Sequence, residues 1–306
     1  MKVYNFVQYF LILYKYIFVM PWDNRVQKNE AIKSSKEAYS YESPFPEYDN
    51  IVKNPTLIEK FSFKGKDTLN LGIKELDLIF IDTLFNKYID EWNPSNKSED
   101  VVFTKNSKFN LSYPEFDAFV LYCYIRHYQP KNMIEIGSGQ STRVIVQALL
   151  KNNNNCKLTC IEPYTNIEYL KKIYPVNTIK DMVENVDINL FTTLGENDIL
   201  FIDSSHVLKP FGDVEYEYLH ILPILNDGCI VHIHDIFYPH DYPRVWIFDW
   251  RCVLTEQQIL IAFLYGNKYW KLLCANHYLT TTKKEIIPQK IEVRCGGSFW
   301  IKKIKY

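Results

Sequence analysis

The chain has 306 residues, of which 47% are hydrophobic and 23% are charged, the ordinary composition of a globular protein with enough apolar material for a core. Its 35 basic and 36 acidic side chains give a formal net charge of −1, without the clustered basic excess of an electrostatic nucleic-acid binder. We therefore expect no nucleic-acid partner. The length lies between that of one large domain and that of two small ones.

The seven cysteines indicate reduced thiols rather than disulfides or metal ligands. None of them forms a Cys-x-x-Cys pair, and most lie in apolar runs, where a thiol behaves as a small hydrophobic side chain. Reduced thiols are typical of the cytoplasm, which is the location that we expect.

Residues 3–20 are strongly apolar and raise the question of a membrane segment. Asn5, Gln8 and Lys15 fall along one helical stripe, whereas a spanning helix has about 20 residues with few polar groups. No small-residue cleavage site of a secretory signal follows. We predict an amphipathic helix that packs on its own domain; peripheral membrane association or a signal anchor stays open as an alternative.

Residues 1–110 form a predicted N-terminal accessory region, which we expect to cover the active site or to mediate a homodimer. After the helix at 3–20, the stretch at 21–70 is proline-rich and irregular, and apolar residues at helical spacing predict a helix within 71–92. The apolar positions of this helix are Ile73, Leu76, Phe80, Leu84 and Tyr88.

Residues 111–306 form the predicted main domain, in which strands and helices alternate after an opening helix. Ser112 and Glu115 have the spacing of a capping box, so this helix should begin at Ser112 and run to about His127. Strands are then predicted at 133–136, 157–162, 177–180, 198–203, 229–235, 269–279 and 298–305, with helices at 141–150, 167–173, 212–225 and 255–265.

This alternation predicts an α/β fold, a three-layer αβα sandwich around a seven-stranded, mostly parallel Rossmann-like sheet. The last two strand runs have no identifiable helix between them, and therefore predict an antiparallel C-terminal hairpin at the sheet edge. Dinucleotide-binding domains continue with parallel units instead, so this ending disfavours an NAD site.

A glycine-containing loop follows the first predicted strand and opens the next helix. Gly137 and Gly139 allow a tight turn and close approach of a ligand to the helix N-terminus, although an ordinary strand–turn–helix has a similar pattern. A dinucleotide-binding loop normally has Gly or Ala where this chain has Thr142. Glu162 ends the second strand, where a carboxylate can accept hydrogen bonds from both ribose hydroxyls of an adenosine.

These features resemble the class I S-adenosylmethionine (SAM)-dependent methyltransferases, and within them a bacterial group of the methyltransferase-24 type. The matching segments are 134–142, 161–164, 198–206, 231–236 and 297–300, with a looser match at 41–47. The resemblance implies the seven-stranded fold, SAM as the cofactor and methyl transfer, with Glu135 helping to hold the methionine amine. The expected cofactor-binding residues are Glu135, Gly137, Ser138, Gly139, Ser141, Thr142, Glu162, Asp203 and Ser204.

Acidic and imidazole side chains follow the fourth and fifth predicted strands, at the sheet edge where ligands bind in open parallel sheets. Asp203 and Asp235 end these strands, and His206 and His234 lie beside them in the sequence. Methyl transfer from a sulfonium requires an aligned nucleophile and removal of its proton, and imidazole has a suitable pKa. We predict His206 as the general base, with His234 second and Asp235 also catalytic; Asp203 contacts the cofactor or orients the base.

A divalent metal is an alternative use of the two carboxylates. Catechol-type O-methyltransferases have Mg²⁺-binding carboxylates at these strand ends, but Ile236 stands where that type has an amide ligand. We therefore expect no metal ligand, with Mg²⁺ dependence left open. His232, on the same strand as His234, is expected to be a hydrogen-bonded structural residue.

The predicted function is transfer of a methyl group from SAM to an oxygen or nitrogen acceptor on a small molecule or a glycan sugar. The preference for a sugar rests on similarity to macrolide-sugar O-methyltransferases. Trp246–Trp250 and the helix that carries Glu256 and Gln257 either form a wall of the acceptor pocket or pack in the core. A non-catalytic SAM-binding scaffold and an NAD(P)-dependent oxidoreductase stay open.

Overall fold

The computed structural model describes residues 51, 53–92, 113–152, 155–164 and 167–305. Two compact units divide the chain, Met1–Ile58 and Glu59–Tyr306, and the sheet lies in the second. The predicted helix at 3–20 and the predicted irregular stretch up to residue 50 lie outside the described residues.

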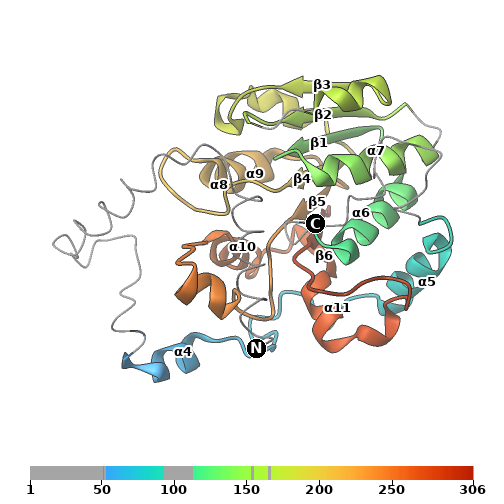
Figure 1. The fold of residues 1–306 in the computed structure, drawn as a ribbon. Coiled ribbons are helices and arrows are strands. Elements are labelled where there is room, and N and C mark those ends of the chain that lie inside the picture. The colour runs from blue at the N-terminus through green and yellow to red at the C-terminus, as the bar shows by residue number, and fades with distance from the viewer. Residues whose placement is uncertain (1–50, 52, 93–112, 153–154, 165–166, 306) are drawn as a thin grey trace, which may run out of the picture. The chain divides into compact units, whose positions relative to one another are not determined.

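A seven-stranded sheet organises the second unit, in the order β3-β2-β1-β4-β5-β7-β6 (Figure 1). Strands β1 to β5 are mutually parallel, and β7 pairs antiparallel with both β5 and β6. The predicted fold class is therefore confirmed. The strands are β1 (Asn132–Ile136), β2 (Lys157–Ile161), β3 (Val176–Ile179), β4 (Ile199–Ile202), β5 (Ile230–Ile233), β6 (Trp270–Ala275) and β7 (Phe299–Lys303).

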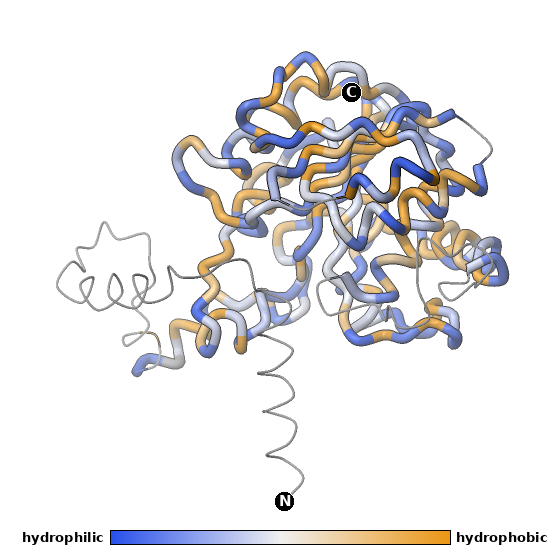
Figure 2. Tube along the Cα trace, turned by 45° about the horizontal axis from the view of Figure 1, so that its top comes forward, coloured by the Kyte–Doolittle hydropathy of each residue, from blue (hydrophilic) through white to orange (hydrophobic). Residues whose placement is uncertain are grey.

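The sequence of the central strands explains their position. All four residues of β4 and of β5 are buried, which requires nearly continuous apolar side chains because both faces of a parallel sheet are covered by helices. Hydrophobic segments accordingly run through the strands in the interior of the trace (Figure 2). The carboxyl ends of these strands then present the polar residues that come after them.

The helices pack as two groups on either side of the strands (Figure 1). One group contains α5 (Leu78–Tyr88), α6 (Glu115–Tyr128) and α7 (Gln140–Asn152); the other contains α8 (Asp213–Tyr216), a π-helical turn (Glu217–Ile221), α9 (Leu222–Ile224) and α10 (Glu256–Leu264). The remaining elements are α4 (Pro55–Phe61), α11 (Asn276–Thr282), a second π-helical turn (Val245–Asp249) and 3₁₀ turns at Glu168–Lys172, Val183–Asn185, Ile188–Thr193 and Lys284–Ile286.

Three local predictions are wrong. The helix α6 begins at Glu115, and its N-cap is Pro114, which has an extended backbone and no side-chain acceptor; the predicted cap, Ser112, lies outside the described residues. The helix expected at 167–173 is a 3₁₀ turn. The predicted antiparallel pairing of the last two strands is confirmed, but the expectation of no helix between them is wrong, because α11 connects β6 to β7.

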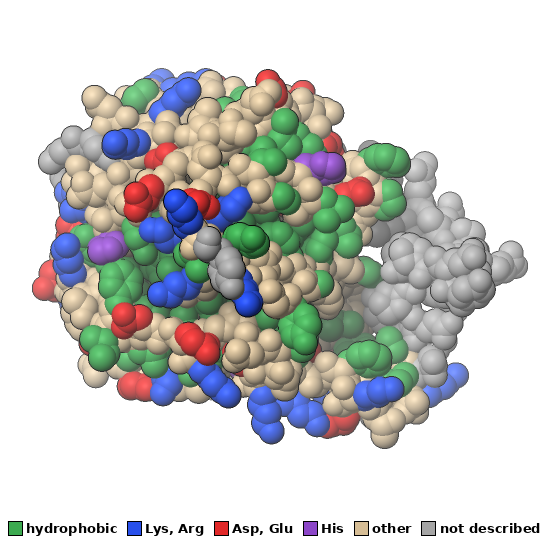
Figure 3. Space-filling model, turned by 180° about the vertical axis from the view of Figure 1, so that it is seen from behind, with side chains coloured by type: hydrophobic (Ala, Val, Ile, Leu, Met, Phe, Trp, Pro, Cys, Tyr) green, Lys and Arg blue, Asp and Glu red, His purple; other side chains and the backbone are tan. Residues whose placement is uncertain are grey.

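The helix predicted within 71–92 is present but shorter, because Asp77 caps α5 by accepting from the Phe80 amide at 2.9 Å. Asp67 holds the preceding residues in turns by accepting from the amides of Leu71 (2.8 Å) and Ile73 (3.1 Å). Among the described helices, none has the length and apolarity needed to cross a membrane. Basic and acidic side chains are interspersed on the face in Figure 3, in accord with the small net charge.

Candidate functional site

The loop between β1 and α7 lies directly against the end of β4. Gly137 has φ +80°, and a Cβ added there would lie 1.9 Å from the Asp203 carbonyl oxygen. Glycine is therefore required for the two backbones to approach so closely. A Cβ added at Gly139 meets no atom within 4 Å, so space is open beside the N-terminus of α7.

Glu135 lies beneath this loop and faces the protein interior. Its fully buried carboxylate accepts from the hydroxyls of Ser141 and Thr142, each at 2.7 Å, and from the Cys160 thiol at 3.3 Å. Burial raises the pKa of Glu135 to about 7, although these donors oppose the shift. In this structure Glu135 supports the loop from below, and its contact with a methionine amine stays a prediction.

Glu162 lies beside the same loop, at the carboxyl end of β2. Its side chain is partly exposed and accepts from the Ser138 amide at 3.1 Å and from the Tyr164 amide at 2.6 Å. The carboxylate thus joins the glycine loop to the chain after β2. Its position at the strand end is the one from which an acidic residue binds ribose in nucleotide-binding sheets.

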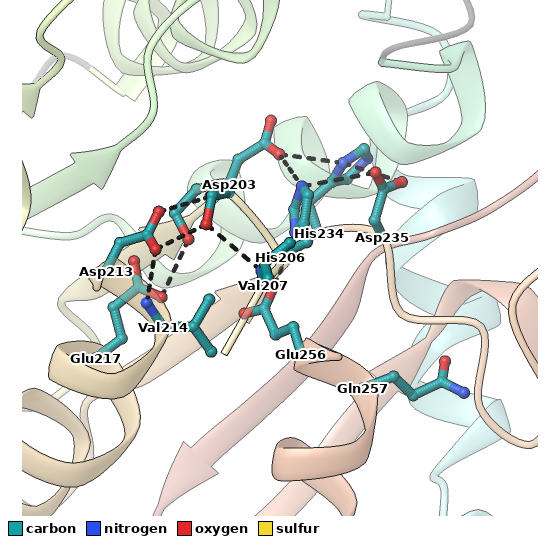
Figure 4. A network of polar contacts seen from close by, with 12 residues as sticks. Asp203, His206, Val207, Asp213, Val214, Glu217, His234, Asp235, Glu256 and Gln257 are labelled. Carbon is teal, nitrogen blue, oxygen red and sulfur yellow. Dashed lines mark hydrogen bonds and ion pairs between the residues drawn. The ribbon is translucent and has the colours of Figure 1, made fainter. Parts of the chain in front are cut away.

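Asp203, His206, His234 and Asp235 come together beyond β4 and β5, as their sequence positions predicted (Figure 4). His206 Nε2 lies 3.3 Å from Asp203 Oδ1 and 3.6 Å from Asp235 Oδ2. His234 Nδ1 lies 3.5 Å from each of the same two carboxyl groups. Both His206 and Asp235 have positive φ, a backbone state that clusters at functional sites.

The electrostatics of this cluster favour charged imidazoles. Burial lowers the pKa of His206, but its hydrogen bonds with Asp203 and Glu256 and the surrounding carboxylates outweigh this, so the pKa lies well above its ordinary value. Burial likewise opposes ionisation of Asp203, yet the nearby His234 and His206 hold its pKa well below the usual range. Carboxylate and imidazolium therefore stabilise each other at neutral pH.

Ser204 is a predicted cofactor residue whose side chain contacts the π-helical turn. Its hydroxyl donates to Glu217 on the π-helical turn at 3.1 Å, instead of to the glycine loop. Burial raises the pKa of Glu217 well above its ordinary value, which favours the neutral form of this acid.

Two acidic residues of the cluster were missed as site residues. Glu256, at the start of α10, is fully buried, and its Oε2 lies 2.7 Å from His206 Nδ1. Asp117, on α6, is fully buried, and its Oδ2 lies 3.7 Å from His234 Nε2. Asp117 had one usable signal, an acidic residue inside an otherwise apolar helical run; nothing in the sequence linked Glu256 to His206, 50 residues before it.

His232 is hydrogen-bonded inside the sheet, the arrangement expected for a structural histidine. Its Nε2 lies 2.8 Å from Ser298 Oγ, and its ring stacks on Phe201 with centroids 4.0 Å apart. Burial lowers the pKa of His232 well below its ordinary value, so this imidazole is neutral.

The donor set at the strand ends does not suit Mg²⁺. This ion prefers oxygen ligands in octahedral geometry, whereas the polar groups nearest to Asp203 and Asp235 are the two imidazole nitrogens. Within the described ranges, no group of three or more His, Cys, Asp or Glu side chains has the arrangement of a metal site.

Aromatic side chains flank the segment after β5. The Trp246 ring lies 5.2 Å from that of Phe237 and stacks on Trp250 at 6.1 Å with an interplanar angle of 19°. None of the residues of the π-helical turn that contains Trp246 is buried. This segment is therefore a partly exposed aromatic surface rather than core.

Part of the N-terminal region contacts the same segment. Tyr238 donates from its hydroxyl to Asp67 at 2.5 Å, and Ser62 donates to Asp241 at 2.6 Å. Phe63 packs edge-on against the Tyr238 ring, with centroids 5.3 Å apart. The stretch at 62–67 thus lies against the loop after β5.

The sequence of residues 134–236 is similar to that of a known protein family. A family model described as a methyltransferase domain matches residues 134–236. An uncharacterized protein of Archaeoglobus fulgidus is 29% identical over 165 residues, which cover 51% of this chain and 72% of that protein. The match thus includes most of the relative's length.

Solved structures are similar at lower identity. The SAH-bound methyltransferase PaMTH1 of Podospora anserina is 16% identical, with 86% of this chain and 98% of that chain covered at a TM-score of 0.43. An O-methyltransferase from Bacillus cereus in complex with SAH is 11% identical, with 73% and 91% covered at a TM-score of 0.39.

The matched region contains β1, the glycine loop and the polar ends of β4 and β5, and it lies within a sheet whose last strand, β7, is inserted antiparallel between β5 and β6. Residues 134–236 therefore match the model of a methyltransferase domain, and they lie in a seven-stranded sheet of the kind that the resemblance to class I methyltransferases implied.

Proposed function

We propose that this chain transfers a methyl group from SAM to an oxygen or nitrogen acceptor on a small molecule or a glycan sugar. One observation supports this most directly. The glycine loop, Glu162 and the acid–imidazole cluster share one sheet edge, with the Gly137 loop against the Asp203 backbone. A nucleoside-binding element and a proton-accepting group are thereby adjacent.

The residues beside the glycine loop suit SAM. Open space at Gly139 gives a ligand access to the N-terminus of α7, and the partly exposed Glu162 carboxylate suits a pair of ribose hydroxyls. The methyltransferase domain family, whose model matches residues 134–236, supports a methyl donor in this place. An NAD site is disfavoured by the antiparallel β7, because dinucleotide-binding sheets continue with parallel units.

SAM, when bound, supplies an electrophilic methyl group on a positively charged sulfur. That chemistry would exchange the carbon–sulfur bond of SAM for a bond between the methyl carbon and the acceptor oxygen or nitrogen, with a neutral thioether as the leaving group. The acceptor's proton passes to Nε2 of His206, while Asp203 and Asp235 stabilise the imidazolium that results. Because the pKa of His206 is raised, this proton transfer should become faster as the pH rises above neutrality.

The aromatic surface on the segment after β5 supports the acceptor class. Trp246 and Trp250 offer stacked, partly exposed rings next to the segment after β5, and rings of this kind pack against flat apolar faces of ligands. A sugar ring or a planar heterocycle has such a face.

Methyl-transfer assays with labelled SAM test the function. Nucleotide sugars, oligosaccharides and small phenols would be screened as acceptors with the wild-type chain and with His206→Asn. We expect transfer to one acceptor class, at least about 100-fold slower in the variant, with SAM affinity unchanged. Full activity of His206→Asn would contradict the base assignment, and SAM binding without transfer to any acceptor would favour the scaffold alternative.

A further inference from the structure

We propose that Glu256 is the positioning residue of His206. The Glu256 carboxylate accepts the proton on His206 Nδ1 and thereby orients the ring so that Nε2 faces Asp203 and Asp235. This assignment rests on the proposed function, in which His206 accepts the acceptor's proton. Glu256 lies outside the residues 134–236 that match the methyltransferase family.

The distances favour Glu256 over the other two carboxylates as the partner that fixes the ring. His206 Nδ1 lies 2.7 Å from Glu256 Oε2, the length of a charge-assisted hydrogen bond. Nε2 lies 3.3 Å from Asp203 and 3.6 Å from Asp235, which are weaker contacts. A neutral His206 ring therefore carries its single proton on Nδ1. The lone pair of Nε2 then points to the ends of β4 and β5.

The start of α10 holds the backbone of His206 as well as its side chain. The amides of Thr255 and Glu256 both donate to the His206 carbonyl, at 2.9 and 3.1 Å. The Leu208 amide donates to Thr255 Oγ1 at 2.7 Å, which ties the same loop to the same helix end. These contacts stabilise the left-handed backbone of His206, with φ +60°.

The Glu256 carboxylate is fully satisfied in this position. The side chain is 0% exposed, and its second oxygen accepts from the Tyr218 hydroxyl at 3.1 Å. A buried carboxylate is costly unless it is paired and hydrogen-bonded, so His206 and Glu256 stabilise each other. The titratable groups that face His206 are Asp203, His234, Asp235, Glu217 and Glu256.

Glu217→Gln is the matched control for Glu256→Gln. Both glutamates are fully buried, and Glu217 on the π-helical turn bonds Ser204 rather than the imidazole. Burial raises the pKa of Glu217 and thereby favours its neutral form, so replacing it by an amide should alter the charge around His206 less than Glu256→Gln does.

Nitrogen-15 and proton NMR of the His206 ring, together with kinetics, test the assignment. In the wild type we expect a downfield Nδ1 proton that is protected from exchange. Glu256→Gln should remove this signature and lower the pKa of His206 by about one unit or more. It should also reduce kcat by about 100-fold or more at an unchanged KM for SAM. Glu217→Gln should leave the Nδ1 proton and kcat within about threefold of the wild type.

An Nδ1 resonance that is unchanged in Glu256→Gln, or a wild-type ring whose protected proton is on Nε2, would overturn the proposal. The wild-type spectrum decides the point if Glu256→Gln fails to fold. The NMR result also does not depend on turnover, so a chain that binds no SAM would refute the proposed function without deciding the role of Glu256.

Discussion

At the scale of single residues, the site depends on a few side chains and backbone positions with strict requirements. Gly137 must be glycine because of its contact with the Asp203 carbonyl, whereas Gly139 borders open space. Glu135 keeps a buried carboxyl group under the loop. Each of these requirements gives a separate prediction.

Gly137→Ala should destabilise the protein, and Gly139→Ala should not. Gly137→Ala places a Cβ against the Asp203 backbone, on a residue whose own φ is positive. We expect the free energy of unfolding to fall by at least about 2 kcal/mol. The second places a methyl group in empty space, where it would weaken SAM binding instead. Thermal unfolding and SAM titration of both variants check this contrast, which equal melting temperatures would refute.

Glu135 should make stability depend on pH in a defined direction. The pKa of Glu135 in the folded state is about 7, above the ordinary 4.5. Its contribution to the free energy of unfolding is therefore fully present below pH 4.5 and is lost as the pH rises through 7. The shift corresponds to about 3 kcal/mol. Denaturant unfolding between pH 5 and 8 should therefore show a decline that is absent in Glu135→Gln, and parallel curves for the two proteins would contradict the assignment.

At the scale of elements, the site depends on segments far apart in the sequence. The start of α10 binds the loop after β4 through His206, and α6 binds the turn before β7 through Asp117. The carboxylate of Asp117 accepts from the amides of Gly297 (2.9 Å) and Ser298 (3.1 Å) and from Asn276 (2.6 Å). Helix and sheet edge are thereby joined under His234.

Asp117→Asn should destabilise this junction and the histidine above it. An amide places a donor against two backbone donors and removes the charged group that faces His234 Nε2, so we expect the free energy of unfolding to fall by about 2–4 kcal/mol. The pKa of His234, measured by NMR, should fall in the same variant. Asp82→Asn, at a partly exposed position of α5, is the control and should change the free energy of unfolding by less than about 0.5 kcal/mol. Equal stabilities of the two variants would refute this role of Asp117.

At the scale of the whole molecule, the sheet has five parallel strands and an antiparallel β7 between β5 and β6, and the region that matches a methyltransferase domain includes β2 to β5. This architecture was predictable because alternating apolar strands and amphipathic helices determine a parallel sheet, and because Asp203 and Asp235 stand directly after strands. The pairing of β7 was also foreseen, although the helix α11 was not. Its sequence, with three consecutive threonines, has no strong helical signal.

The partners of the two histidines could not be read from the sequence. Glu256 and Asp117 contact His206 and His234 only through tertiary packing. The sequence around a buried acid contains no periodic pattern that identifies the residue it will contact. The same holds for Asp67, which meets Tyr238 across 171 positions. Local pattern thus predicts the polar residues at the end of each strand, while long-range polar pairs require the folded chain.

The donor set around Asp203 and Asp235 predicts metal-independent transfer. Imidazole nitrogens lie where further oxygen ligands would be needed, so EDTA should change the methyl-transfer rate by less than about twofold, and added Mg²⁺ should not raise it. A rate that vanishes with EDTA and returns with Mg²⁺ would show that the imidazoles move aside for an ion.

Calorimetric titration with SAM, and separately with NAD, tests the central claim most directly. The wild type should bind SAM with micromolar affinity. Glu162→Ala should weaken the free energy of SAM binding by about 2 kcal/mol, as expected for the loss of a charge-assisted ribose contact. Glu168→Ala, an exposed acid on the following 3₁₀ turn, should retain the wild-type affinity. A folded wild-type chain that binds no SAM would contradict the account, and NAD binding in its place would favour an oxidoreductase.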